Sequence, residues 1–181
     1  LSFAAPEKIT MLDKAIGALT KALKSEAIVF TLSRFEEFPD LWTISDITFR
    51  DMKKVSNANP QQAEFVWGRS ELVDYINADG KRLRAILTKP DNFDPAKKYP
   101  LMVYIYEELT NGLHRYSAPS PGTSINMARY VSNGYILLQP DIVYTTGYPG
   151  EDAFKCVIPA VQHVVEMGFV DPARIGIQGH S

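Results

Sequence analysis

One stretch of the chain has residue types and spacing that suit nucleophilic catalysis. Residues 175–181 read I-G-I-Q-G-H-S, an apolar run that ends in a Gly-x-Ser triplet. A serine that follows a buried strand through a sharp turn carries its hydroxyl above the sheet edge, where a general base can take its proton. Such a turn strains the backbone of the serine, and Gly179 is small enough to let the turn close before Ser181. By itself, Gly-x-Ser is a common triplet that is more typical of an ordinary loop serine.

The elements predicted upstream place this serine where a nucleophile belongs. Two continuous apolar runs, 101–106 and 135–139, are typical of strands buried on both faces. A helix is predicted at 124–131, a second helix at 152–167 and a last strand at 174–178. The predicted order is therefore strand, helix, strand, helix, strand. With right-handed crossovers, this order gives a mostly parallel sheet with helices on both faces.

Two further strands, 72–77 and 81–88, precede these elements and form a hairpin. Asp79-Gly80 lies between them and supplies the positive φ of a tight turn. With this hairpin counted, Ser181 follows the fifth strand, which is where the nucleophile of an α/β-hydrolase lies.

The second helix has one predicted cap and one predicted apolar side. Asp152 is a candidate N-cap, and Cys156 is interpreted as a buried helix residue. The residues expected on the apolar side are Phe154, Val157, Ile158, Val161, Val164 and Val165.

The first third of the chain is predicted to be rich in β-structure. Runs of β-branched and aromatic residues predict strands at 27–33 and 41–45, and 52–56 is a candidate third strand. Residues 6–26 leave two alternatives open. Their apolar residues recur at helical spacing, and a strand pair that turns at Gly17 competes with the amphipathic helix.

Composition excludes several classes of function. The net charge of -2 provides no basic surplus to neutralise phosphates, so we expect no nucleic-acid partner. A single cysteine excludes an internal disulfide and a site of several thiolates, and no cofactor or metal motif is present. No apolar run approaches the about 20 residues of a membrane-spanning helix. The chain lacks an initiator methionine, so we expect the N-terminus to lie upstream, and neither compartment nor oligomeric state is predicted.

Several segments, in order, resemble one family. The sequence from Trp67 onward is similar to the catalytic domain of prolyl oligopeptidase-family serine peptidases, especially their dipeptidyl-peptidase and acylaminoacyl-peptidase branches. The similar segments are 79–81 (DGK), 98–101 (KYPL), the strand ending at Tyr106, 133–135 (NGY), 147–150 (GYPG), 168–172 (GFVDP) and 179–181 (GHS).

This resemblance implies an α/β fold with two parts. Residues 1–66 would be the last part of a β-propeller with its linker, and residues 67–181 the N-terminal half of an α/β-hydrolase domain. It also favours strands over a helix in the ambiguous segment at 6–26.

The resemblance further implies a Ser-Asp-His triad, in that chain order, with Ser181 as nucleophile. Tyr106 occupies the place of the tyrosine that donates its hydroxyl to the oxyanion hole. Without the resemblance, Tyr106 would be interpreted as an aromatic residue at a strand end. None of the three histidines, His114, His163 and His180, has the position of the triad base, and Asp141 is interpreted as a residue that structures a loop.

One departure from the family pattern follows Tyr106. Small residues are expected there, but this chain has Glu107 and Glu108. Two carboxylates beside an oxyanion hole oppose developing negative charge unless they point away or are paired. We expect them to be solvated or paired with a base such as Arg115; recognition of a substrate amino group is the alternative.

The function that these observations predict is a serine peptidase that hydrolyses short peptides through an acyl-enzyme. Two alternatives stay open, an esterase of the same fold and a non-catalytic interaction module that has lost the triad. Because the triad aspartate and histidine are expected beyond Ser181, the 181-residue chain is expected to be inactive by itself.

Overall fold

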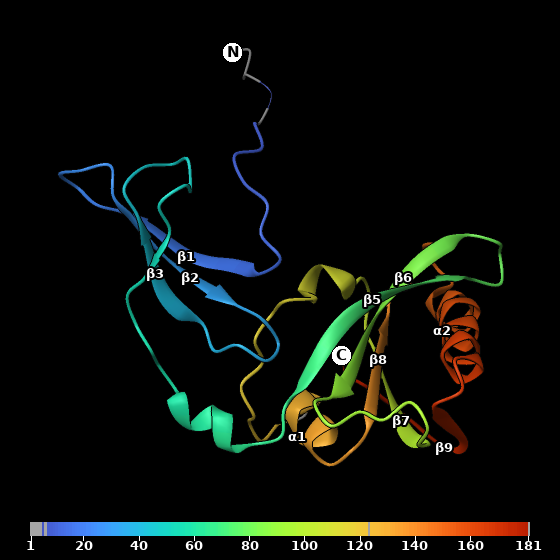
Figure 1. Cartoon of the computed structure of the whole chain (residues 1–181). Helices are drawn as coiled ribbons and strands as arrows, with labels where there is room; N and C mark the ends of the chain where they lie inside the picture. The colour runs from blue at the N-terminus through green and yellow to red at the C-terminus, as the bar shows by residue number, and fades with distance from the viewer. Residues whose placement is uncertain (1–4, 6, 123, 181) are drawn as a thin grey trace. The chain divides into compact units, whose positions relative to one another are not determined.

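The computed structural model describes residue 5, residues 7–122 and residues 124–180. Its described residues divide into two compact units (Figure 1). The first holds residues 1–62 together with 114–116, and the second holds residues 63–113 and 117–181.

The first unit is built on an antiparallel four-stranded sheet in which chain neighbours pair. The strands are β1 (Ala15–Lys21), β2 (Ile28–Ser33), β3 (Asp40–Ile44) and β4 (Lys53–Lys54), in the order β1-β2-β3-β4. The alternating apolar residues of β2 fill its core, as expected for a strand with one buried face. The buried core residues are Ile28, Phe30, Leu32 and Ile44, with Leu12, Trp42, Phe49 and Met52 packed against them.

The helix considered for residues 6–26 is wrong, because Ala15–Lys21 forms strand β1. A strand pair that turns at Gly17 is also wrong, since β1 continues past that residue. A bulge interrupts β1. Gly17 pairs with Thr31 and Thr20 with Val29, so β1 carries one extra residue over this interval, and Ala18 has a φ of 49°. The apolar residues Ile9, Ile16, Leu19 and Leu23, which gave the helical spacing, are exposed, so their spacing does not mark a buried face.

The second unit contains a five-stranded mixed sheet in the order β5-β6-β8-β7-β9. Its strands are β5 (Gly68–Ile76), β6 (Arg82–Pro90), β7 (Tyr99–Ile105), β8 (Ile136–Pro140) and β9 (Val170–Gly179). The predicted strands at the hairpin and at the two apolar runs are confirmed. The pairs β7–β8 and β7–β9 are parallel, whereas β5–β6 and β6–β8 are antiparallel. Within the described strands the sheet is therefore less parallel than expected, because the hairpin adds antiparallel strands at one edge.

The two helices α1 (Met127–Ser132) and α2 (Pro149–Glu166) cover opposite faces of this sheet, as predicted (Figure 1). Helix α2 packs in one core cluster with Ala85 and Leu87 of β6. Helix α1 lies on the other face, where a Cβ added to Gly68 would come within 2.4 Å of Val131. Gly68 pairs with Pro90 of β6. Because side chains alternate along a strand, Pro90 lies on the face of β6 opposite to Ala85 and Leu87, and Gly68 faces the same way as Pro90.

The predicted cap of α2 is wrong. The helix begins at Pro149, one turn earlier than expected, with Tyr148 at the N-cap position. Proline suits the first helical position because its missing N–H would have no partner there. The Asp152 carboxylate instead accepts a hydrogen bond from the Thr145 N–H of the preceding loop.

The apolar side predicted for α2 is partly wrong. Val157 and Val164 are buried with Cys156, as expected, and Ala160 joins them. Phe154 and Ile158 are exposed to 68% and 39%. The buried stripe is therefore rotated away from these two residues, toward the smaller side chains.

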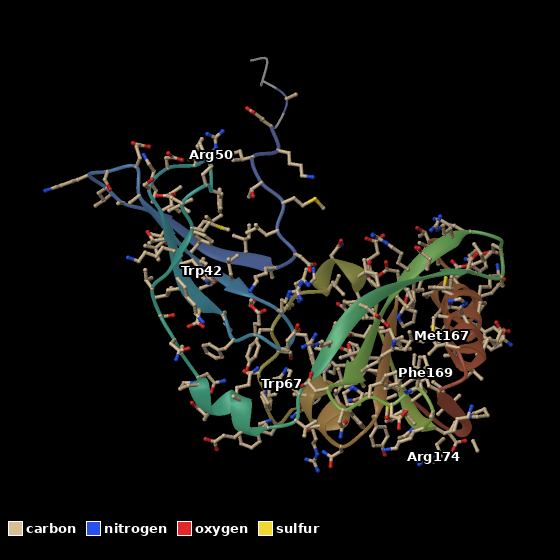
Figure 2. The ribbon with its side chains drawn as sticks, viewed as in Figure 1. Trp42, Arg50, Trp67, Met167, Phe169 and Arg174 are labelled. Carbon is tan, nitrogen blue, oxygen red and sulfur yellow. The ribbon has the colours of Figure 1, made fainter. Side chains whose placement is uncertain are left out.

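An aromatic cluster joins the end of α2 to the start of β7. The Phe93 ring stacks on Tyr99 with centroids 5.3 Å apart and meets Phe169 edge-on at 5.1 Å. The Phe169 side chain lies just after the last turn of α2 (Figure 2). The backbone carbonyl of Phe169 accepts a hydrogen bond from the Tyr99 N–H at 2.8 Å, so β9 enters the sheet beside β7.

Candidate active site

Three neighbouring parallel strands bring the candidate residues to one edge of the sheet. In the order β8-β7-β9, each strand points the same way. Asp141 follows β8, Tyr106 follows β7 and His180 follows β9. Because Ile105 pairs with Gly179, Tyr106 and His180 are the next residues on adjacent strands. The carboxyl edge of such a sheet is the usual place for a binding site in α/β proteins.

The predicted nucleophile, Ser181, lies outside the described residues. The glycine that precedes it is closely packed: a Cβ at Gly179 would lie 3.0 Å from Cγ1 of Ile105 and 3.5 Å from the Ile105 carbonyl oxygen. A larger residue would therefore push β9 away from β7 at the point where the strand ends. This close approach is in keeping with the small residue that a strand-to-serine turn requires.

Tyr106 has an accessible side chain in a polar environment. It is 47% exposed and lines two open cavities of about 640 and 410 Å³. Glu107 and Tyr144 line both cavities with it. Among the described residues, none forms a hydrogen bond with the Tyr106 hydroxyl, so this donor is open to a bound molecule.

The backbone around Tyr106 is held by the segment that follows β8. The Tyr144 hydroxyl donates a hydrogen bond of 2.7 Å to the Tyr106 carbonyl oxygen. The Ile142 N–H donates to the Glu107 carbonyl oxygen at 3.1 Å. Burial raises the pKa of Tyr144, and the nearby Glu107 charge raises it further, so its hydroxyl stays protonated and able to donate at neutral pH.

Asp141 holds the other end of the same turn. One of its carboxylate oxygens accepts the backbone N–H groups of Leu109 and Thr110, at 2.7 and 2.9 Å, and the other accepts the Thr110 hydroxyl. The prediction that Asp141 structures a loop is confirmed, and the loop is the one that begins at Tyr106. The roles of Thr110 and Tyr144 were missed, because nothing in their spacing indicates that the two loops meet.

Glu107 and Glu108 are both exposed and line the larger cavity together with Lys81. No ion pair that involves either glutamate occurs among the described residues, and Arg115 belongs to the first unit. The expectation of solvated carboxylates therefore fits better than the expectation of a pair with Arg115.

The three histidines lie apart, one on a helix, one at a strand end and one in the first unit. His163 is on α2 and His180 directly follows β9. His114 belongs to the first unit, where its Nε2 atom lies 2.9 Å from a carboxylate oxygen of Asp13. Burial and the nearby Arg34 lower the pKa of His114. It does not line the cavities at Tyr106.

In the described part of the chain, no group of three or more His, Cys, Asp or Glu side chains is arranged to hold a metal ion. No described helix has the length and apolar character needed to cross a bilayer.

Sequence relatives of the chain are fungal peptidases. It is 30% identical over 131 residues to a protein named probable dipeptidyl-aminopeptidase B of Ajellomyces capsulatus. It is 32% identical over 127 residues to dipeptidyl-aminopeptidase B of Aspergillus niger. Each alignment covers 62% of this chain and 13% of the relative. The chain thus spans a small part of the length of these relatives, and no protein-family model matches it.

Solved structures share the fold at low sequence identity. The acylaminoacyl peptidase of Pyrococcus horikoshii superposes with a TM-score of 0.70 at 14% identity, over 97% of this chain and 28% of that structure. Dipeptidyl peptidase 4 of Porphyromonas gingivalis gives 0.67 at 18% identity, over 96% and 26%. The sequence relatives agree with the resemblance to prolyl oligopeptidase-family peptidases that the motifs indicated, and the structural neighbours share the fold of this chain.

Proposed function

We propose that the full-length protein containing this sequence is a serine peptidase that forms an acyl-enzyme at Ser181. The observation that carries the proposal is the register of β7 and β9, which brings Tyr106 beside the residues that lead into Ser181. The Ser181 hydroxyl attacks the scissile carbonyl carbon, and a histidine base takes its proton and passes it to the leaving amine. Water then hydrolyses the acyl-enzyme.

Tyr106 is proposed to stabilise the tetrahedral intermediate. Its hydroxyl has no hydrogen-bond partner among the described residues, it is accessible, and it follows the strand next to the one that leads to Ser181. A donor at this position bonds the oxyanion more strongly than the ground-state carbonyl, and therefore lowers the barrier of the chemical step. The backbone N–H after the nucleophile would be the second donor.

The domain assignment is part of the proposal. Residues 1–66 would be the last part of a β-propeller and its linker; the antiparallel meander β1-β2-β3-β4 is the arrangement expected of a blade. Residues 67–181 would be the N-terminal half of an α/β-hydrolase domain. The helices on both faces and the parallel strands β8, β7 and β9 support this assignment.

The proposed substrates are short peptides with a free N-terminus. This class follows from the names of the sequence relatives, which are dipeptidyl-aminopeptidases. An esterase is the second candidate, because the same nucleophile and oxyanion donors serve ester and amide substrates. Rates on dipeptidyl p-nitroanilides and on p-nitrophenyl esters, measured with the full-length protein, separate the two.

Two substitutions in the full-length protein test the assignments. Ser181→Ala should abolish turnover of the p-nitroanilide with the fold retained, and turnover at the wild-type rate would exclude Ser181 as nucleophile. Tyr106→Phe should lower kcat by about 10- to 1,000-fold with a smaller change in KM. Tyr135→Phe is the matched control, since Tyr135 precedes β8 at the opposite edge of the sheet. A wild-type protein without hydrolase activity would favour the non-catalytic interaction module.

A further inference from the structure

We propose that Asp141 and Thr110 are positioning residues that fix the oxyanion tyrosine, Tyr106, for catalysis. This inference deepens the proposed function and rests on it. Neither residue is expected to touch the substrate. Each would act by holding the turn 106–110, from whose first residue the phenol projects.

The turn is bonded at both ends to the segment that follows β8. At its start, the carbonyl groups of Tyr106 and Glu107 accept hydrogen bonds from the Tyr144 hydroxyl and the Ile142 N–H. At its end, the Asp141 carboxylate accepts the three donors of Leu109 and Thr110. Only three residues separate Tyr106 from Thr110, so the backbone between the two anchored ends has little freedom.

Asp141 is itself tied to the sheet. Its backbone N–H donates to the Arg84 carbonyl of β6 at 2.9 Å, and its own carbonyl accepts the Tyr75 hydroxyl of β5 at 2.8 Å. The Asp141 carboxylate therefore projects from a backbone that two strands hold in place. The Asp141 carboxylate therefore fixes the turn 106–110 to the sheet that also contains β9.

Between Tyr106 and Thr110 the turn has little burial to hold it in place. Glu107 and Glu108 are exposed neighbours of like charge. Thr110, by contrast, is buried, and its hydroxyl and N–H both bond the Asp141 carboxylate. Hydrogen bonds to a charged acceptor are about twice as strong as those between neutral groups, so this contact dominates the anchoring of the turn. A small displacement of a catalytic group lowers the rate steeply, because an error of about 1 Å is enough to lose about 100-fold.

Thr110→Val in the full-length protein tests the proposal with little change of shape. We expect kcat on a dipeptidyl p-nitroanilide to fall about tenfold, the effect of one lost bond to a charged group, with KM nearly unchanged. Thr110→Ser keeps the hydroxyl and should restore most of the rate. Thr88→Val is the matched control, since it removes another buried threonine hydroxyl, which bonds Ser70 away from this edge, and should leave kcat unchanged.

A double-mutant cycle with Tyr106→Phe distinguishes positioning from general destabilisation. If Thr110 acts through the Tyr106 hydroxyl, Thr110→Val should have no further effect on kcat once that hydroxyl is gone. Multiplied effects in the double variant, or a kcat that Thr110→Val leaves unchanged, would overturn the proposal. Asp141→Ala should show the same coupling with a larger loss, about 100-fold, and its thermal unfolding is measured alongside the rate.

The outcomes also separate this inference from the proposed function. A wild-type protein that shows no Ser181-dependent turnover would refute the proposed function, and the inference would fall with it. Turnover that depends on Ser181 and Tyr106 but not on Thr110 or Asp141 would refute the inference alone.

Discussion

The charge of Asp40 is expected to stabilise the first unit. Asp40 opens β3 and is only 7% exposed. Its carboxylate accepts hydrogen bonds from the Ser56 hydroxyl at 2.6 Å and the Ala58 N–H at 2.7 Å, and lies 2.6 Å from the Lys54 ammonium. Burial by itself raises the pKa of Asp40, but the bonds from Lys54, Ser56 and Ala58 together outweigh it and lower the pKa from 3.8 to about 2.

The direction of this pKa change sets the direction of the pH effect. A carboxyl group whose pKa is lower in the folded state stabilises the fold above its unfolded pKa, near pH 4, and loses that contribution as the pH falls through 2. The interval from 3.8 to about 2 corresponds to at most about 2.5 kcal/mol. Lys54 is 44% exposed, so solvent screens the ion pair, and we expect about 1 to 2 kcal/mol.

The perturbation is Asp40→Asn, which keeps the shape of the side chain and removes its charge. Urea unfolding of the 181-residue chain is followed by the fluorescence of Trp42, which pairs with Lys54 in the first unit (Figure 2). A Trp67→Phe background leaves Trp42 as the only tryptophan. Asp40→Asn should lower the free energy of unfolding at pH 7 by about 1 to 2 kcal/mol, and the difference from wild type should shrink as the pH falls below about 4 and vanish below about pH 2.

Glu26→Gln is the control for this experiment, because Glu26 and Lys21 form an exposed ion pair on the same sheet. It should change the free energy of unfolding by less than about 0.5 kcal/mol. A difference between wild type and Asp40→Asn that stays constant from pH 7 to pH 2 would refute the reasoning, since it would show that the charge of Asp40 is not what stabilises the sheet.

Three further predictions concern the packing of the second unit, and each is tested by the free energy of urea unfolding of the chain. Gly68→Ala should destabilise it by about 3 kcal/mol, because the new Cβ would meet Val131 at 2.4 Å and the Lys89 carbonyl oxygen at 2.5 Å; a neutral result would contradict this packing. Gly150→Ala, within α2 and with nothing inside 4 Å of the new Cβ, should stabilise by about 0.5 to 1 kcal/mol, whereas a loss would show that the helix start is different. Phe154→Ala should change stability by less than about 0.5 kcal/mol, whereas Val164→Ala should lower it by about 2 kcal/mol; a loss at Phe154 as large as that at Val164 would restore the apolar side predicted from sequence.

Features that depend on local composition were predictable. The apolar runs at β7 and β8 mark buried strands without any knowledge of their neighbours. The hairpin between β5 and β6 was equally visible, because Asp79-Gly80 supplies the turn, and Gly80 has the expected positive φ of 76°. Such features depend on residues close in sequence, so tertiary contacts had little opportunity to override them.

Features that depend on pairing or on the relative rotation of elements were not predictable. The bulge in β1 becomes visible only through its pairing with β2. The buried stripe of α2 depends on which part of the helix faces the sheet, so exposed Phe154 could not be told from buried Val157. At the site, the apolar run 101–106 placed Tyr106 at a strand end and the family resemblance pointed to its role, but its support by Thr110 and Tyr144 joins loops more than thirty residues apart in sequence.

The acidic character of the turn after Tyr106 is compatible with the proposed oxyanion hole because of how the charges are distributed. Asp141 adds a third carboxylate near Glu107 and Glu108, but three donors from Leu109 and Thr110 surround it. Its charge is thereby bound to the backbone of the turn. The two glutamates are exposed, where water weakens their effect on a developing oxyanion. The Asp141 carboxylate thus orders the turn while the two glutamates face solvent, which leaves the Tyr106 hydroxyl as the proposed donor to the oxyanion.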